Sequence, residues 1–190
     1  FETVVCVNPH GWVHDTRHNA QDVDINWSYA RDDVVEVGVI KDLARDRRFE
    51  FVIDCHEDWE SPGFYLYELR RGGAPIGEEI ARRVAEICPL NESVEIEGES
   101  ARGGLVYADI AKVENLRGQG IPLELYYGHT DHLFTVETPT GLAMETRVAA
   151  QLAVLDAVIA DHLKSSTRNT RRSSRCAMYR AFRPRRRPSS

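Results

Sequence analysis

The feature that most constrains the fold of this chain is a strand-like run that ends on a histidine among acidic residues. Residues 49–55 are rich in Phe, Val and Ile, and His56, Glu57 and Asp58 follow directly. Open α/β sheets carry their chemistry at the carboxyl ends of their strands, and histidine serves both as a metal ligand and as an acid or base. We therefore expect a functional site at the end of this strand.

Helix-like and strand-like segments alternate around this run. Apolar residues recur at helical spacing between about residues 32 and 47 and again between residues 76 and 87. Further strands are expected at 3–7, 64–68 and 132–137, surface loops at 91–128, and the strongest helix at 142–163. This order predicts an α/β fold with a mixed, mostly parallel sheet flanked by helices.

Charge divides the chain into two parts. Residues 1–164 hold 30 acidic residues against 15 Lys and Arg, a net charge of −15, whereas residues 165–190 hold nine Arg and no acid, a net charge of +9. We predict a globular domain over 1–164 and a disordered tail over 165–190, because an Arg-, Ser- and Pro-rich segment cannot bury enough apolar surface to fold alone. A basic arm can bind RNA or anionic surfaces, but these Arg residues are not interleaved with aromatic residues as in a single-strand binder. Nucleic acid is therefore not the expected partner, and the tail is interpreted as solvated or artefactual.

Composition also excludes several classes of protein. There is no apolar run long enough to cross a bilayer, so no membrane partner is expected, and a cytoplasmic location is predicted. The chain begins with Phe1 rather than Met and has no basic, apolar leader, which favours a fragment of something longer over a processed protein.

The four cysteines lack the short paired spacing of a zinc knuckle or a disulfide framework. We expect buried, reduced thiols at Cys6, Cys55, Cys88 and Cys176.

Several short motifs follow one another in a fixed order along residues 3–163. They read Asn8-Pro9-His10-Gly11, Thr16-Arg17-His18-Asn19, Val23-Asp24-Ile25-Asn26, Ile53-Asp54-Cys55-His56-Glu57-Asp58, Gly63-Phe64-Tyr65-x-Tyr67-Glu68 and Phe134-Thr135-Val136-Glu137-Thr138-Pro139. In order, spacing and flanks the chain resembles the zinc carboxypeptidase family of the carboxypeptidase A type. That family includes murein peptide amidases and relatives of succinylglutamate desuccinylase and aspartoacylase. The resemblance implies a zinc carboxypeptidase-like catalytic domain over 1–164.

The resemblance implies a Zn²⁺ cofactor and two central residues. His56 matches a zinc ligand; a catalytic zinc keeps three protein ligands and one open position for water. Glu137 matches the general base that takes a proton from zinc-bound water and passes it to the leaving nitrogen. Without the neighbouring motifs, His56 would be interpreted as a core histidine and Glu137 as an acid that caps the following helix.

Three residues of the first loops match roles in the family's site, two in substrate binding and one beside the metal. Arg17 corresponds to the arginine that stabilises the oxyanion and contacts the substrate, and Asn26 to the residue that binds the terminal carboxylate of the substrate. Asp24 would accept a hydrogen bond from a zinc-bound histidine. The implied activity is hydrolysis of a peptide or amide bond next to a free carboxylate, with a peptide or acyl-amino acid as substrate.

The chain departs from the family pattern in two places. The first two zinc ligands of the family lie in a His-x-x-Glu motif upstream of Asn-Pro-x-Gly, and nothing precedes Phe1 to hold it, so the amino-terminal part is expected to be missing. Trp27 stands where the family has an Arg beside Asn26. Losing that bidentate donor weakens the expectation of an ordinary peptide carboxyl terminus as substrate.

Three histidines and three tyrosines are further candidates for the site. His10, His14 and His18 are spaced by four, but we expect Pro9 and Gly11 to break the helix that this spacing requires, so no replacement metal site is predicted. Tyr107, Tyr126 and Tyr127 are candidates to cover the site. Aromatic residues ahead of a strand more often serve packing, and none of the three is assigned a role.

Two alternative functions remain open from the sequence. The first is an N-acyl-amino-acid deacylase of the same family, although Glu137-Thr138-Pro139 stands where that branch tends to have Glu-Val-Gly-Pro. The second is a metal-free, inactive relative that binds ligands or partners, which the missing ligands and Trp27 motivate.

Overall fold

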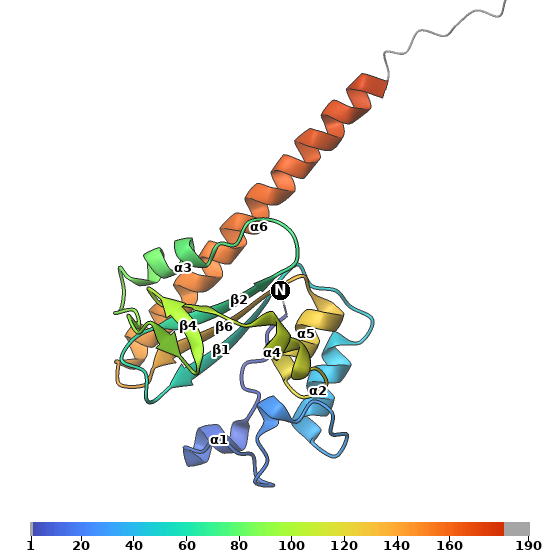
Figure 1. Cartoon of the computed structure of the whole chain (residues 1–190). Coiled ribbons are helices and arrows are strands. Elements are labelled where there is room, and N and C mark those ends of the chain that lie inside the picture. Colours follow the sequence, from blue (N-terminus) through green and yellow to red (C-terminus); the bar gives the residue numbers. More distant parts are fainter. Residues whose placement is uncertain (1, 181–190) are drawn as a thin grey trace, which may run out of the picture.

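The chain folds around a six-stranded mixed sheet, seen in a computed structural model that describes residues 2–180, with side chains as far as residue 164. Along the sheet the order is β1-β6-β2-β5-β4-β3 (Figure 1). The strand bounds are β1 (Val52–Asp58), β2 (Tyr65–Arg70), β3 (Glu95–Ile96), β4 (Glu99–Arg102), β5 (Leu105–Tyr107) and β6 (His132–Pro139). β1 pairs with β6, and β2 with β5, in parallel, whereas the other three pairs are antiparallel. The predicted α/β class with a mixed sheet flanked by helices is confirmed, but the sheet is not mostly parallel, because β2 joins β6, and β4 joins β3 and β5, through antiparallel pairs.

Helices cover both faces of this sheet (Figure 1). α3 (Gly77–Val84) and α6 (Met144–Arg180) pack against each other and against β2 and β6 on one face. On the other face, α5 (Ile121–His129) contacts β6 and β1, with α4 (Ile110–Asn115) nearby in the same apolar cluster. α2 (Val35–Ala44) and the 3₁₀ helix η1 (Ile25–Trp27) pack beyond α5, and α1 (Pro9–His14) precedes them in the chain.

The alternation of side chains along β6 builds two cores from one strand. Phe134 and Val136 are fully buried against α3 and α6, in a cluster that includes Val154 and Val158. Leu133 points to the opposite face and packs with residues of α4 and α5. Because successive residues of a strand face opposite sides, this central strand needs apolar residues in both directions, as in other sheets covered on both faces.

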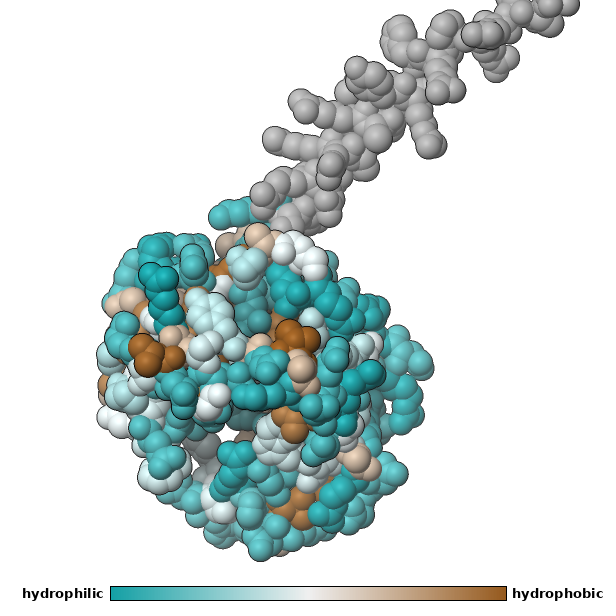
Figure 2. Space-filling view, viewed as in Figure 1, coloured by the Kyte–Doolittle hydropathy of each residue, from teal (hydrophilic) through white to brown (hydrophobic). Residues whose placement is uncertain are grey.

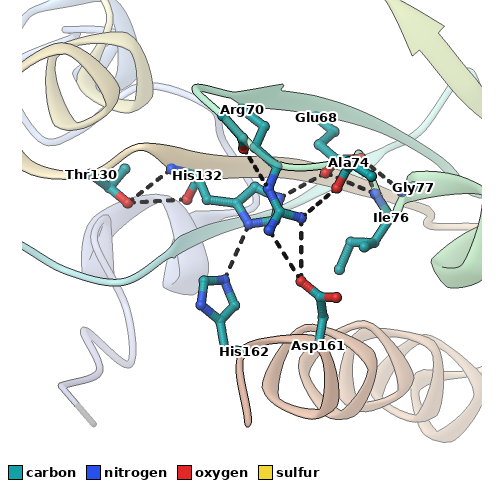
Figure 3. Close-up of polar contacts among 10 residues, drawn as sticks. Glu68, Arg70, Ala74, Ile76, Gly77, Thr130, His132, Asp161 and His162 are labelled. Atoms are coloured by element: carbon teal, nitrogen blue, oxygen red, sulfur yellow. Dashed lines mark hydrogen bonds and ion pairs between the residues drawn. The ribbon is translucent and has the colours of Figure 1, made fainter. Parts of the chain in front are cut away.

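A buried polar network joins the sheet to α3 and α6 at the amino end of β6 (Figure 3). His132 Nε2 lies 2.7 Å from Glu68 Oε1, and His132 Nδ1 lies 3.2 Å from His162 Nε2. Glu68 also accepts the backbone N–H groups of Ile76 and Gly77, where α3 begins. A carboxylate only accepts, so His132 donates to Glu68 through Nε2, and the 3.2 Å contact between His132 Nδ1 and His162 Nε2 is a hydrogen bond whose direction depends on the tautomers of the two rings. The network therefore determines how three elements meet.

The charges of this network are compensated inside the structure. Only 3% of the His132 side chain and 8% of the Glu68 side chain is exposed, so neither group is solvated by bulk water. Beside them, Arg70 binds Asp161 of α6 at 3.2 Å (Figure 3). Burial is the largest influence on His162 and lowers its pKa, which favours a neutral ring. Buried polar groups are stable only when paired in this way.

Two expectations about secondary structure were wrong. Residues 3–7 form no strand, and the Val5 side chain is 94% exposed, because these residues have no ladder partner in the described sheet. The stretch 91–128 is not a run of loops but contains β3, β4, β5, α4 and α5. Its strands have two to four residues, which is too short for periodicity to detect.

The cysteine prediction holds at one of three described positions. Cys88 is buried in the core between the sheet and α3, whereas Cys6 and Cys55 are exposed. Cys55 is exposed because β1 is the edge strand of the described sheet. The side chain of Cys176 lies outside the described residues.

The surface in view is largely hydrophilic, with apolar residues scattered in small groups (Figure 2). Within the described residues, no helix combines the length and apolar character needed to cross a bilayer. The predicted boundary between domain and tail falls inside α6, and the side chains beyond residue 164 and residues 181–190 lie outside the description, so that division stays a prediction.

Candidate active site

His56 and Glu137 lie side by side near the carboxyl ends of two paired strands. In the parallel ladder of β1 and β6, His56 is the partner of Glu137. Partners in register share a face, and residues two apart on one strand do so as well, which places Asp54 and Asp58 on the same side. Tyr65 of β2 is the antiparallel partner of Glu137 and extends this polar face to a third strand. The face is the one opposite to α6.

The His56 ring is held by a carboxylate of its own strand. Its Nε2 lies 2.7 Å from Asp54 Oδ2, and the imidazole is half-buried. Burial is the largest single influence on the pKa of His56 and favours the neutral ring. The hydrogen bond and charge of Asp54, together with the charge of Glu137, outweigh it and raise the pKa to about 9. At neutral pH this histidine therefore carries a proton that any metal ion would have to displace.

Replacing Asp54 with Asn should lower the pKa of His56 towards its ordinary value, because the amide keeps the shape but removes the charge. A proton-detected NMR titration of the imidazole measures this directly. The folded-state pKa lies above the unfolded one, so the pair stabilises the fold fully below pH 6.5, and this contribution disappears as the pH rises towards 9. Asp156→Asn, an exposed change on α6, should leave the titration unchanged. An unchanged curve for Asp54→Asn would contradict the assigned cause.

Glu137 is shifted towards a proton-exchanging role by its surroundings. Burial raises the pKa of this carboxyl to about 7; His56 opposes the shift, while Glu97, Asp58 and Asp54 add to it. A carboxyl whose pKa lies near working pH can both accept and return a proton. The site thus contains a half-buried carboxyl with a raised pKa next to an imidazolium, and the zinc-ligand role of His56 and the general-base role of Glu137 stay predictions.

Two tyrosines and a glutamate complete this face, and none of them was identified from the sequence. The hydroxyl of Tyr65 donates to Asp58 at 3.0 Å, and that of Tyr67 donates to Glu97 at 2.6 Å. Burial raises the pKa of both tyrosines, and the charges of Glu137 and Glu97 add to the shift. Tyr65 and Tyr67 are two residues apart on β2 and therefore share a face of the sheet. This spacing identifies both tyrosines as neighbours of the site only when the register of β2 with Glu137 is known.

Arg17 is delivered by the Asn-Pro-x-Gly turn. Asn8 caps α1 by accepting the N–H of Gly11 at 2.9 Å, and its amide donates to the carbonyl of Arg17 at 3.0 Å. Any side chain at position 11 would overlap Asn8 and the carbonyl of Thr16, so glycine is required there. The charge of Arg17 lies near enough to lower the pKa of His56. The loop therefore brings a guanidinium towards the paired strands.

The other residues of the first loops make contacts that differ from the implied roles. Asp24 accepts from Arg17 Nε at 2.8 Å and caps η1 through the N–H of Asn26, whereas His56 binds Asp54. Asn26 is half-buried in η1. Trp27 packs its indole over Gly120 at the start of α5. The residue that replaces the family arginine is thus a packing contact between η1 and α5.

The expectation that Pro9 and Gly11 prevent a helix was wrong. Proline is favoured in the first turn of a helix, where its missing N–H costs nothing, and α1 runs from Pro9 to His14. The rings of His10 and His14 lie 4.3 Å apart on this helix, while His18 lies outside it and binds Asp22.

The three tyrosines that were candidates to cover the site lie elsewhere in the fold. Tyr126 is buried with residues of α4, β2 and β6, and Tyr127 packs against it. Tyr107 is half exposed on β5. Their aromatic rings serve packing or surface roles, and the tyrosines that border Glu137 are Tyr65 and Tyr67.

The described residues do not form a complete metal centre. Among the side chains that the structure describes, no three His, Cys, Asp or Glu converge to hold a metal ion. The Nε2 of His56 is engaged with Asp54, and the nearby carboxylates lie on β1 (Asp54 and Asp58), on β6 (Glu137) and in the turn between β3 and β4 (Glu97). A catalytic zinc needs three protein ligands, so the residues present fit at most a part of such a site.

Comparison with known proteins shows which fold this is. No protein-family model and no curated protein matches the chain. Crystal structures of three proposed metallopeptidases match it, from Shewanella denitrificans OS217 (TM-score 0.64, 19% identity), Shewanella amazonensis SB2B (0.63, 17%) and Shewanella baltica OS155 (0.65, 20%). The chain shares the fold of these proteins. The alignments cover 80–82% of this chain but 58–60% of theirs, so the chain spans about three fifths of their length.

Proposed function

We propose that this chain is the part of a metal-dependent peptide hydrolase that carries the acid-base residue. The observation that supports this most directly is the pairing of His56 with Glu137 at the carboxyl ends of β1 and β6. The likeness to three proposed metallopeptidases is in line with it. Ligands beyond the described residues would have to complete the metal centre.

Each polar residue of the site has a role in this proposal. Glu137, with its pKa raised to about 7, takes the proton of the attacking water and returns it to the leaving nitrogen. Arg17 stabilises the negative charge that develops on the scissile carbonyl oxygen. His56 would hold the metal ion as one of its ligands once its ring is neutral, and Asp54, which contacts Nε2, orients that ring.

More narrowly, we propose a carboxypeptidase of the carboxypeptidase A type, which cleaves an amide bond next to a free carboxylate. The order of motifs from Asn8 to Pro139 supports this narrower assignment, with Asn26 as a contact to the carboxylate. An N-acyl-amino-acid deacylase would use the same Glu137 and Arg17. The two activities differ in what lies on the acyl side of the bond.

The free carboxylate provides the test. The full-length protein loaded with zinc should release amino acids from peptides with a free carboxyl terminus at least about a hundredfold faster than from the same peptides with an amidated terminus, because an unpaired polar group at the site costs several kcal/mol. Amino-acid release measured by chromatography reports both rates. Equal rates would exclude a carboxypeptidase, cleavage of acyl-amino acids alone would identify the deacylase, and no release from either would leave an inactive relative.

A further inference from the structure

β1 carries His56 but is an edge strand of the described sheet. Only β6 pairs with it, so its last residues are held from one side. Strand ends that are held on one side open more readily than central strands. A site that depends on the position of His56 relative to Glu137 therefore needs a further restraint on this end of β1.

α6 supplies such a restraint through Gln151. Its Nε2 donates to the carbonyl oxygen of His56 at 3.2 Å and to Thr138 Oγ1 at 3.5 Å. The hydroxyl of Thr138 donates to the same carbonyl at 3.4 Å, and Thr138 is 1% exposed. One side-chain amide thus contacts the backbone of the candidate metal ligand and the residue that follows the candidate base.

A second contact from the same helix face reaches the next residue of β1. Arg147, one turn before Gln151, forms an ion pair with Glu57. The Arg147 side chain is largely buried, at 15% exposed, whereas the Glu57 side chain is 41% exposed, so the contact lies at the surface with its guanidinium covered. Together the two α6 residues hold His56 and Glu57 from the side of the sheet opposite to the site.

Polar side chains at positions 147 and 151 stabilise the fold less than apolar side chains would at this buried face of α6. The neighbouring positions of the same face, Ala150, Val154 and Val158, are apolar and fully buried. By contrast, Gln151 Oε1 and Arg147 Nε are buried without a partner among the described residues. Unpaired buried polar groups disfavour folding. Residues that disfavour folding locally are expected where they serve a function, so Gln151 and Arg147 are candidates for one.

We propose that Gln151 and Thr138 are positioning residues that hold the His56 end of β1 against the Glu137 end of β6. The inference rests on the proposed function for its catalytic consequence. The geometric part stands on the contacts from α6 alone. The two parts can therefore be tested separately.

The experiment compares Thr138→Val and Gln151→Met with Thr138→Ser. Valine matches the shape of threonine without its hydroxyl, methionine matches the length of glutamine without its amide, and serine keeps the hydroxyl. Backbone amide exchange of residues 56–58, followed by NMR, should become at least about tenfold faster in the first two variants. Exchange in Thr138→Ser should match that of the unsubstituted chain, and the amides of β2 residues 66–68 should keep their rates in all three.

Kinetics of the zinc-loaded full-length protein give the second readout. A displacement of the strand end should lower kcat about tenfold to a hundredfold in Thr138→Val and Gln151→Met with less than about a twofold change in KM. Thr138→Ser should restore kcat. Unchanged exchange at residues 56–58 in both variants, or a serine variant that behaves like valine, would overturn the proposal. Faster exchange in a protein that hydrolyses no peptide would support the positioning role and overturn the proposed function.

Discussion

Replacing Glu137 with Gln should reduce peptide hydrolysis by about 10²–10⁴-fold without loss of the fold, because the amide matches the carboxyl in shape but cannot accept a proton. The position is well suited to this test. Glu137 is half-buried and is the ladder partner of His56. Single-turnover rates of the zinc-loaded full-length protein measure the effect.

The stability of the same variant provides an independent check. Burial raises the pKa of Glu137 from 4.5 to about 7, so the folded chain binds this proton more tightly than the unfolded one. Ionisation therefore destabilises the fold progressively between pH 4.5 and pH 7. Glu137→Gln removes this cost and should be at least as stable as the unsubstituted chain at pH 8, with a flatter dependence on pH. A large loss of stability at pH 8 would assign Glu137 a structural role instead.

Replacing Glu68 with Ala should destabilise the fold by about 3–5 kcal/mol, the largest effect we expect on stability. The substitution leaves His132 Nε2–H and the N–H groups of Ile76 and Gly77 without an acceptor in the interior. Removing the carboxylate that accepts all these hydrogen bonds in the interior costs about this much, because the remaining groups are neither solvated nor paired. Urea unfolding followed by circular dichroism measures the change.

Two matched variants separate the causes of this loss. Glu68→Gln keeps one acceptor oxygen and the side-chain volume, so its cost should be smaller than that of alanine. Glu86→Ala, an exposed change on the segment after α3, should cost less than about 1 kcal/mol. If Glu68→Ala cost no more than Glu86→Ala, the network of Figure 3 would contribute little to stability.

Elements with a long, regular pattern were predictable from the sequence. The helical spacing of Val34, Val35, Val39, Ile40 and Leu43 placed α2, although Val35 and Val39 are exposed and Val37 is buried in their stead. The apolar run before His56 placed β1, and the run from His132 placed β6. The strand predicted at 3–7 is absent, because its short apolar pattern says nothing about a pairing partner. A strand is stable only with a partner, and the pattern of one segment carries no information about its neighbours.

The candidate site shows the same division. His56 and Glu137 were identifiable because each ends a strand and lies in a motif that resembles a known family, and the register of β1 with β6 places them together. Tyr65, Tyr67 and Glu97 were not, since their relation to Glu137 arises from pairing across strands and from a turn more than thirty residues away. Their roles and those of Arg17 and Asn26 stay predictions.

The sequence by itself determined the longer strands and helices, such as β1, β6 and the start of α6, and which side chains have the chemistry to exchange protons or to serve as metal ligands. Periodicity and side-chain type are properties of a single stretch of chain, so they can be read without coordinates. The tertiary structure decided the pKa of Glu137, the partner of His56 and the contact of Gln151 with the edge strand. These depend on burial and on groups far apart in the sequence, because desolvation and hydrogen bonding act through space and not along the chain.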